Sequence, residues 1–421
     1  MRSMLKASIA ALGLAAVSAG GAFAAGHQLT GDLRIFADMS NPAPRNAIET
    51  VVGQFQEMHP DLNVELTIIE REAWKTQIRN ALTADAPDVV NWYAANRMLP
   101  YVNANLFEDV SDVWEDPEIA ENLASTKSAM TIDGKQWGVP YTYYQWGIYY
   151  RLDIYNELGL SEPANWDEFV ANCQAIIDSG RTCFSIGTKN FWTAGGWYDY
   201  INMRTNGYDF HMAQARGEIP WTDDRVRQTF ANWRQLIDMG AFVENHQSYS
   251  WQESVPAFVS GDAAAMLKGN FAVAAYRDGG LDDSKLDFHQ FPVINPDVEL
   301  AEDAPTDTFH IPAQASNKEA ARAFLKFITS ADVQTQINSG AYLGQLPINA
   351  SSSVDNDKFL NEGFEMLSSN SPGGVAQFFD RDFPAEMAAE AMQGLQEFMV
   401  FPDNLDDILA RLEKVRERVY Q

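Results

Sequence analysis

The sequence predicts an α/β protein of two lobes, each a mostly parallel sheet flanked by helices, with a hinge between them. Strand-like and helix-like segments alternate from residue 33 onward, as is typical of parallel sheets covered by helices. The 421 residues exceed what one hydrophobic core usually supports. No long Gly/Ser linker occurs, so short, ordered crossings must join the lobes.

The first segments follow the order strand, helix, strand, helix, strand. We expect a strand over 33–37, a helix over 48–58, a strand over 64–68, a helix over 74–83 and a strand over 88–92. In open α/β sheets, ligands bind beyond the carboxyl ends of the strands. The loops 38–41 and 93–97 should therefore contribute ligand-binding groups.

Helices also recur in the later part of the chain. They are expected over 166–178, 225–239, 257–260, 318–329 and 403–419. The helix at 318 is preceded by Ser316-x-x-Glu319, which has the pattern of a capping box. The final helix is amphipathic, so one face should pack on a core.

The first 24 residues have the features of a secretory signal peptide. Arg2 and Lys6 give a basic start, an apolar run from Ala7 to Val17 follows, and Ala22-Phe23-Ala24 offers small residues for signal peptidase. The apolar run is shorter than a membrane span. We expect cleavage near Ala24 and release of the mature chain into the periplasm.

The mature chain is strongly acidic. The 30 basic residues less Arg2 and Lys6 leave 28, against 58 acidic residues, a formal charge of −30. Such a surface repels phosphate backbones and anionic lipids. Nucleic-acid binding and membrane adsorption are therefore disfavoured, and a solvated acidic coat that keeps an exported protein soluble is a sufficient explanation.

The sequence contains two cysteines, Cys173 and Cys183, between an expected helix and an expected strand over 183–186. In an oxidising compartment they are candidates for a disulfide that closes a short loop. Two buried, unpaired thiols are the alternative.

Aromatic residues crowd into one stretch, Gly134 to Leu160, where several tyrosines and two tryptophans surround a Gly-Val-Pro turn. Such density favours a surface that stacks against a flat apolar face, such as that of a sugar ring. Core packing is the alternative for any one of these rings.

Signals of catalysis are absent from the sequence. The six histidines (residues 27, 59, 211, 246, 289 and 310) show no HExxH or other close metal-binding spacing. No GxSxG or GxxxxGK[ST] motif occurs. We therefore expect a protein that is not an enzyme and needs neither metal nor cofactor, although abundant carboxylates leave a glycosidase open as a remote alternative.

Five short segments occur in the order and at the spacing of one known family. They are Phe55–Pro60 (FQEMHP), Ala86–Val90 (APDVV), Gly134–Pro140 (GKQWGVP), Phe258–Met266 (FVSGDAAAM) and Ser316–Ala321 (SNKEAA). On these segments the chain resembles the extracellular solute-binding proteins of ABC importers, family 1, in the carbohydrate-binding group that includes the maltodextrin-binding protein.

The resemblance implies a type II periplasmic-binding-protein fold whose two lobes close on a ligand. The first lobe would comprise residues 25–142 and 307–348, and the second 143–306 and 349–421. Crossings would lie near 141–145 and 307–312, with a return near 346–350. The chain has Asp307-Thr308-Phe309-His310 where family members often carry a Gly-rich run.

A sugar presents hydroxyl groups at its rim and C–H groups on its faces, so a cleft needs aromatic rings and planar polar side chains. The resemblance favours cleft positions for Trp92, Asn96–Arg97, Trp197, Phe271 and the loop 378–382, where a solvated salt-bridge cluster is the alternative. The complete expected set is Asp38, Ser40, Trp92, Asn96, Arg97, Tyr144, Gln145, Trp192, Trp197, Gly269, Asn270, Phe271, His310, Phe379, Asp380 and Arg381.

The sequence and the resemblance together predict a monomeric periplasmic binding protein that captures a carbohydrate or glycoside and delivers it to the permease subunits of an ABC importer. An alternative ligand is an anionic sugar, sulfonated or carboxylated, which could meet Arg97, Arg151, Arg204 or Arg381.

Overall fold

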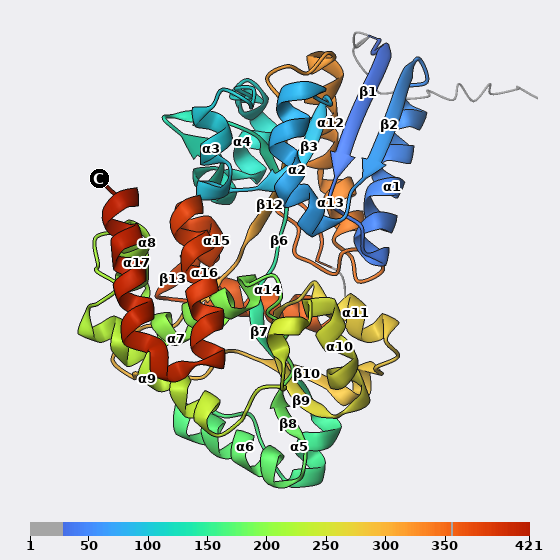
Figure 1. Cartoon of the computed structure of the whole chain (residues 1–421). Helices are drawn as coiled ribbons and strands as arrows, with labels where there is room; N and C mark the ends of the chain where they lie inside the picture. The colour runs from blue at the N-terminus through green and yellow to red at the C-terminus, as the bar shows by residue number, and fades with distance from the viewer. Residues whose placement is uncertain (1–27, 355–356) are drawn as a thin grey trace, which may run out of the picture.

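The chain forms a mixed α/β fold of two lobes, one above the other in Figure 1, in a computed structural model that describes residues 28–354 and 357–421. The expected signal peptide lies outside these residues. One large hydrophobic core is built around Leu33, Trp74 and Phe324, and a second around Ile148 and Trp233. We call the elements around the first core the first lobe and those around the second core the second lobe. The predicted two-lobed α/β fold is confirmed, but the prediction of mostly parallel sheets is wrong, because both sheets are mixed.

The sheet of the first lobe has the strand order β2-β1-β3-β12-β6. Its strands are β1 (Gly31–Ala37), β2 (Leu62–Ile68), β3 (Val89–Tyr93), β6 (Val139–Tyr143) and β12 (Thr306–His310). β1 is parallel to β2 and β3, whereas β12 is antiparallel to β3 and β6. β12 runs antiparallel to its neighbours because the chain enters it from the second lobe, not through a helix that covers the first sheet.

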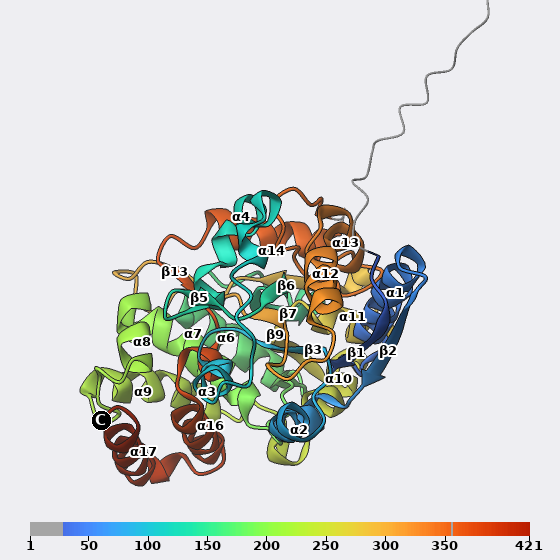
Figure 2. The same cartoon turned by 90° about the horizontal axis from the view of Figure 1, so that it is seen from above.

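Six α-helices belong to the part of the first lobe that is described. They are α1 (Pro42–Met58), α2 (Arg71–Ala84), α3 (Leu99–Asn103), α4 (Pro117–Asn122), α12 (Lys318–Ile328) and α13 (Ala331–Ile337). Helices α1, α12 and α13 lie together beside the sheet (Figure 2), and the ring centroids of Phe55 and Phe324 are 5.4 Å apart. A small hairpin of β4 (Thr131–Ile132) and β5 (Lys135–Gln136) extends this lobe.

The capping box expected before α12 is wrong. The N-cap is Asn317, whose side chain accepts from the Ala320 N–H, while the Ser316 hydroxyl donates to Asp88. A complete capping box occurs instead in the second lobe, where Ser250 and Glu253 begin a helix.

The sheet of the second lobe has the strand order β10-β7-β9-β8. Its strands are β7 (Trp146–Arg151), β8 (Thr182–Phe184), β9 (Ala263–Gly269) and β10 (Leu286–His289). β8 is parallel to β9, and β7, the strand that arrives from the first lobe, is antiparallel to β9 and β10. Alternate residues face two cores, since Ile148 packs in one and Tyr149 in the other. A separate parallel pair joins β11 (Ala301–Asp303) to β13 (Gly374–Ala376).

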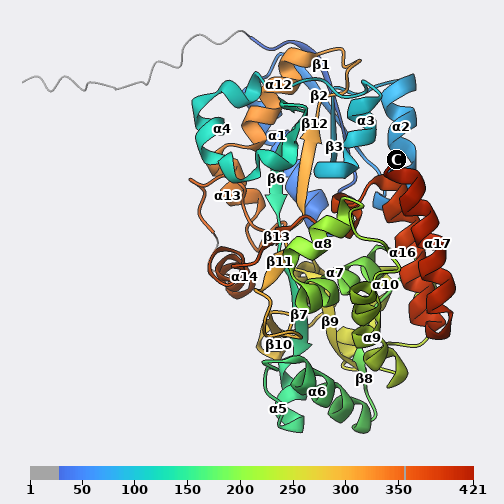
Figure 3. The same cartoon turned by 90° about the vertical axis from the view of Figure 1, so that its left-hand side faces the viewer.

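Helices surround this second sheet. They are α5 (Leu152–Leu158), α6 (Trp166–Asp178), α7 (Trp192–Asn206), α8 (Tyr208–Ala215), α9 (Asp224–Asp238), α10 (Trp251–Ser260), α11 (Ala272–Asp278), α14 (Lys358–Ser369), α15 (Phe379–Asp382), α16 (Ala385–Val400) and α17 (Leu405–Val419). The helix expected over 257–260 is the last part of the longer α10, which contains Pro256. Helices α16 and α17 pack side by side along one edge of the lobe (Figure 3).

The chain passes from β6 to β7 through only Tyr144 and Gln145, and Figure 3 shows one strand leading into the other. The crossing expected over 307–312 is displaced, because Asp307 to His310 pair with β3 and β6 inside the first sheet. We propose that the second crossing lies just before β12, at 304–305, and that the return follows Asn349.

A disulfide joins Cys173 on α6 to Cys183 on β8. Replacing both cysteines with alanine should lower the free energy of unfolding by about 2–3 kcal/mol, because the unfolded chain loses a closed loop. Urea unfolding measures the change. Ligand affinity should stay the same, since neither residue lines the cavity described below; unaltered stability in the variant would contradict a structural role for this bond.

No helix within the two described ranges is long and apolar enough to cross a membrane.

Candidate functional site

A cavity of about 340 Å³ lies between the lobes. This volume is at the lower end of the range for small-molecule sites, about 300–1,000 Å³. Its walls come from the starts of α1, α2 and α7, the end of β3, from β7, α10, α11, β12 and α15, and from loop residues. The lining side chains are Asn41, Pro42, Ala43, Pro44, Arg71, Lys75, Tyr93, Tyr144, Trp146, Trp192, Trp251, Gln252, Val255, Pro256, Phe271, Ala274, Ala275, Asp278, Asp307, Gln345, Phe378, Asp380 and Arg381.

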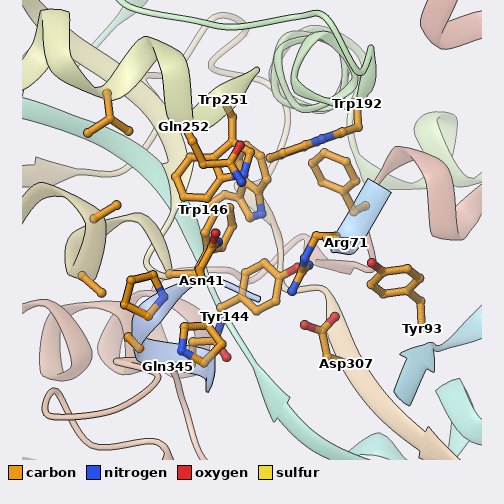
Figure 4. A pocket seen from close by; sticks show the side chains of 18 of the residues that line it. Asn41, Arg71, Tyr93, Tyr144, Trp146, Trp192, Trp251, Gln252, Asp307 and Gln345 are labelled. Atoms are coloured by element: carbon orange, nitrogen blue, oxygen red, sulfur yellow. The ribbon is translucent and has the colours of Figure 1, made fainter. Parts of the chain in front are cut away.

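Six aromatic rings form one wall of the cavity, which we call the aromatic wall: Tyr144, Trp146, Trp192, Trp251, Phe271 and Phe378. The ring centroid of Trp146 lies 4.8 Å from that of Phe378 and 6.0 Å from that of Trp192. Phe271 is 5.3 Å from Trp251. Figure 4 shows Trp146 and Trp251 on one side of the cavity and Asp307 and Tyr93 on the other, with Tyr144 between them. Rings in mutual contact hold one another in place and offer faces and edges to a flat ligand.

The backbone makes room for these rings at glycines. A Cβ on Gly269 would lie 2.6 Å from the Phe271 ring and 2.8 Å from the Tyr144 ring. A Cβ on Gly196 would lie 2.9 Å from the Trp146 ring. Gly269 therefore supports the wall from behind, although it does not line the cavity.

A buried lysine lies against the aromatic wall. Lys268 Nζ is 4.6 Å from the ring centroid of Trp192 and 5.8 Å from that of Trp251, and it has no hydrogen-bond partner among the described residues. Burial lowers the pKa of Lys268 well below its ordinary value. Because the lowered pKa favours the neutral amine, Lys268 contributes to the wall mainly by packing against the ring faces.

Opposite the aromatic wall, a polar cluster is centred on Asp307 and Arg381. The Arg381 guanidinium donates to Asp307 Oδ1 (2.8 Å), to the Thr306 carbonyl (2.7 Å) and to the Tyr144 hydroxyl (3.0 Å). It also lies 4.7 Å from the ring centroid of Tyr93. Burial raises the pKa of Asp307, while Arg381 and Arg71 oppose that rise. The planar guanidinium of Arg381 and the carboxylate of Asp307 can each form two hydrogen bonds in one plane, which suits the hydroxyl groups of a bound ligand.

Asp38 and Arg71 extend this polar cluster within the first lobe. Asp38 accepts from the Tyr93 hydroxyl (2.9 Å) and from the Asn91 amide (2.7 Å). Arg71 Nη2 lies 3.6 Å from Asp38 Oδ1, and among the described residues no hydrogen bond from Arg71 is found. Burial alone would lower the pKa of Arg71, but Asp38, Tyr93 and Asp307 raise it well above its ordinary value. Arg71 therefore stays charged, with donors free for a ligand.

Contacts between the lobes converge on the segment 377–382, which we call the clamp segment. Arg381 reaches β12 as described above. Arg97 Nε lies 3.8 Å from Asp380 Oδ2, and the Asn96 amide donates to the Asp382 carbonyl at 2.6 Å. These contacts hold the segment of the second lobe against the first lobe, at the edge of the cavity.

Two buried carboxylates fix the backbone of the clamp segment. Asp382 accepts from the N–H groups of Gln377 (2.8 Å) and Phe378 (3.1 Å), and Asp199 accepts from the Phe379 N–H (2.7 Å). Burial raises the pKa of Asp382 to about 6. Phe378 has φ of 128°, a conformation unusual for a residue with a side chain. The anchored backbone directs Phe378 into the aromatic wall and Phe379 away from it.

The structure brings five of the expected site residues to the cavity: Tyr144, Trp192, Phe271, Asp380 and Arg381. A second group lies directly behind the lining residues or between the lobes. It consists of Asp38, Asn96, Arg97, Gln145, Gly269 and Asn270.

The remaining five expected residues neither line the cavity nor make the contacts of the second group: Ser40, Trp92, Trp197, His310 and Phe379. Trp92 packs on Tyr101 and donates to the Arg97 carbonyl, because successive residues of a strand face opposite sides and Tyr93 takes the cavity side. Trp197 is buried against Phe184 and Phe242. Phe379 stacks on Phe383 inside the second core. Ser40 ends the loop before α1, and its neighbour Asn41 lines the cavity instead.

His310, the last residue of β12, is fully buried and its ring is neutral. Its Nδ1 donates to the Trp137 carbonyl (2.6 Å), its Nε2 accepts from Thr308 (2.7 Å), and it stacks on Phe107 at 4.3 Å. Burial lowers the pKa of His310 to about 4.

The neutral state of His310 predicts a pH dependence of stability. At pH values between about 6.5, the ordinary pKa of histidine, and about 4, residue 310 is protonated in the unfolded chain but neutral in the folded protein. The free energy of unfolding therefore falls as the pH falls. His310 alone should lower it by about 2 kcal/mol at pH 5 relative to pH 7.5. Urea unfolding at both pH values should show a loss of stability that is about 2 kcal/mol larger in wild type than in His310→Gln. The same loss in both proteins would contradict this prediction. Ligand affinity should be unaffected by the substitution.

Two arginines considered for an anionic ligand lie elsewhere. Arg151 is paired with Asp153 and donates to the Phe258 carbonyl, and Arg204 is paired with buried Glu302.

Several lining residues were not named individually from the sequence, although the loop 378–382 that holds Phe378 was expected at the cleft: Asn41, Arg71, Lys75, Tyr93, Trp251, Gln252, Asp307, Gln345 and Phe378. The rule for strand ends already pointed to the loops that hold Asn41 and Tyr93. Trp146 stands in the aromatic stretch. Trp251 and Gln252 carried no signal, because only tertiary packing brings the start of α10 to the cavity.

Within the residues that the structure describes, no group of three His, Cys, Asp or Glu side chains is arranged to hold a metal ion.

The sequence profile of one family, described as "Bacterial extracellular solute-binding protein", matches residues 40–335. The multiple sugar-binding protein of Streptococcus mutans is 23% identical over 292 residues, which cover 68% of each chain. An uncharacterised ABC transporter extracellular-binding protein of Pyrococcus horikoshii is 24% identical over 381 residues, covering 88% of this chain and 85% of its own.

Among solved structures, the bacterial solute receptor AcbH superposes with a TM-score of 0.83 and 25% identity over 93% of this chain and all of its own. That receptor is described as having an exclusive preference for β-D-galactopyranose. A chitin oligosaccharide binding protein has a TM-score of 0.85 and 18% identity over 93% of this chain and 99% of its own, which shows a shared fold.

Proposed function

Because the chain belongs to the family of bacterial extracellular solute-binding proteins, we propose that it is the periplasmic binding component of an ABC importer. It captures a carbohydrate or glycoside in the cavity between its lobes and delivers this ligand to the permease subunits in the membrane. It acts as a monomer, without a cofactor. The family and its structural neighbours are binding proteins, in keeping with a non-enzymatic role.

The observation that carries this proposal is the opposition of the aromatic wall to the Asp307–Arg381 cluster. A pyranose ring has apolar C–H faces and a polar rim, and a cavity for it needs both surfaces at once. Ring faces of Trp146 and Trp192 can stack on the sugar while Asp307, Arg381 and Arg71 reach its hydroxyl groups.

The charges around the cavity favour a neutral ligand. Each basic side chain that lines the cavity has an acidic neighbour within 4 Å: Arg71 has Asp38, Lys75 has Glu72 and Arg381 has Asp307. An anionic sugar would have to compete with these carboxylates, so the anionic alternative receives less support. A glycosidase usually needs two carboxyl groups beside the scissile bond. Of the three carboxylates that line the cavity within the described residues, Asp307 and Asp380 are paired with arginine, and Asp278 lies at the exposed rim.

The mechanism follows from the position of the cavity between the lobes. A ligand that touches residues of both lobes binds the closed state more tightly than an open one, and so shifts the population toward closure. Closure excludes water and strengthens each hydrogen bond to the ligand. The permease then recognises the closed shape.

Isothermal titration of refolded, ligand-stripped protein with a panel of mono-, di- and oligosaccharides tests the proposal. We expect heat of binding from at least one saccharide. Silence across the panel, together with native mass spectra that show no carried-over saccharide in protein purified from its own host, would refute it.

A further inference from the structure

The cavity differs in character between its inner and outer ends. The inner residues Tyr93, Tyr144, Trp146, Asp307 and Arg381 are buried and carry rings or polar groups. The outer end, which we call the apolar mouth, consists of Pro42, Ala43, Pro44, Val255, Pro256, Ala274 and Ala275. Pro42 and Pro256 are exposed, and both alanines of α11 are half-buried, so this set lies where the cavity meets solvent.

Both lobes contribute to the apolar mouth. Pro42–Pro44 form the first turn of α1 in the first lobe, whereas Val255 and Pro256 of α10 and Ala274 and Ala275 of α11 belong to the second. Alanine and proline leave more space than the tryptophans of the inner end. When the lobes close, these apolar faces leave water together, which is favourable if an apolar group fills the space between them.

The start of α1 lacks the donors that a helix usually offers to a ligand. This 17-residue helix begins at the cavity, where free N–H groups and the helix dipole would ordinarily attract an anion or a hydroxyl oxygen. Pro42 and Pro44 have no N–H, and the Arg45 N–H donates to the Asn41 carbonyl at 2.9 Å. Of the first four helical residues, only Ala43 retains a free donor, so the apolar mouth is poorly equipped for a second sugar ring.

We propose that the preferred ligand is a glycoside whose sugar ring occupies the inner end and whose apolar aglycone, an aryl or short alkyl group, occupies the apolar mouth. This inference rests on the proposed function and specifies its ligand class. The rim of the mouth carries the amides of Asn41, Gln252 and Gln345 and the exposed Asp278, which can hydrogen-bond to water or to a linking oxygen without filling the apolar space.

The test compares methyl and phenyl glycosides of glucose, galactose, mannose and xylose, in both anomers, by isothermal titration. For a sugar that binds, the phenyl glycoside should bind at least about tenfold more tightly than the methyl glycoside, because burial of the ring removes apolar surface from water. Phenyl glycosides that bind no better than their methyl counterparts would overturn the inference and leave sugar binding intact. If no glycoside and no free sugar bound, both this inference and the proposed function would be refuted.

Two variants locate the aglycone. Ala274→Phe and, on the facing lobe, Ala43→Phe should each lower the ratio of phenyl to methyl glycoside affinity to about one, because the new ring fills the space of the aglycone. Ala257→Phe, a half-buried alanine of α10 that does not line the cavity, is the matched control and should keep the advantage. A phenyl preference that persists in both Ala274→Phe and Ala43→Phe, with normal circular dichroism, would show that the aglycone does not bind at the apolar mouth.

Discussion

Replacing Arg381 with glutamine should weaken saccharide binding by at least about 100-fold, the largest effect that we expect from a single substitution. Arg381 is 4% exposed and connects the clamp segment to Asp307, Thr306 and Tyr144. Removing one partner of a buried ion pair leaves the other unpaired, which costs about 3–5 kcal/mol. The cost falls on the closed state, because the pair joins the two lobes beside the cavity.

Arg97→Gln is the matched control for this prediction. Its ion pair with Asp380 is longer, at 3.8 Å, and both side chains are partly exposed, so we expect a loss of no more than about tenfold. Isothermal titration gives the affinities, and circular dichroism confirms that the variants are folded. Equal affinities for Arg381→Gln and wild type would contradict the role of the clamp segment.

Trp192→Ala should weaken binding by about 30-fold or more, with little effect on stability. Trp192 begins α7, lines the cavity and is only half-buried, so its ring is available for a ligand to stack on. Truncation of such an aromatic anchor typically costs about 2 kcal/mol or more of binding free energy. Titration and a thermal melt on the same sample separate the two effects.

Trp197→Ala, five residues further along α7, should behave in the opposite way. Its ring is buried between Phe184 and Phe242, and its loss should lower the free energy of unfolding by about 3–5 kcal/mol. The affinity of the folded fraction should be unchanged. If Trp197→Ala lost affinity and Trp192→Ala did not, our assignment of the lining residues would be wrong.

The fold was accessible from the sequence because its signals are local. Periodicity located α1, α6 and the strands β1 to β3, and the absence of a linker required short crossings such as Tyr144–Gln145. The segment 307–310 shows the limit of this approach, because a crossing was expected there and the structure has strand β12. β12 is a strand because it pairs with β3 and β6, which are more than 150 residues away in sequence, and no local pattern reveals that pairing.

The expected residues coincide with the cavity lining only in part, and in three cases the lining residue is the neighbour of the expected one, as with Asn41 and Ser40. Trp92 and Phe379 were expected to line the cavity, but their neighbours Tyr93 and Phe378 do so. On a strand, the pleat decides which of two adjacent aromatic residues faces the ligand. At residue 378 the unusual φ and the anchoring by Asp382 decide it. A cluster of aromatic residues in the sequence can indicate a nearby site, but the direction in which each ring points depends on tertiary contacts.

Small-angle X-ray scattering on ligand-stripped protein, with and without a saccharide that titration shows to bind, tests most directly whether the lobes close on a sugar. We predict a smaller radius of gyration in the saturated sample. An identical scattering curve at full saturation would contradict closure, and the cavity between the lobes would then need another role.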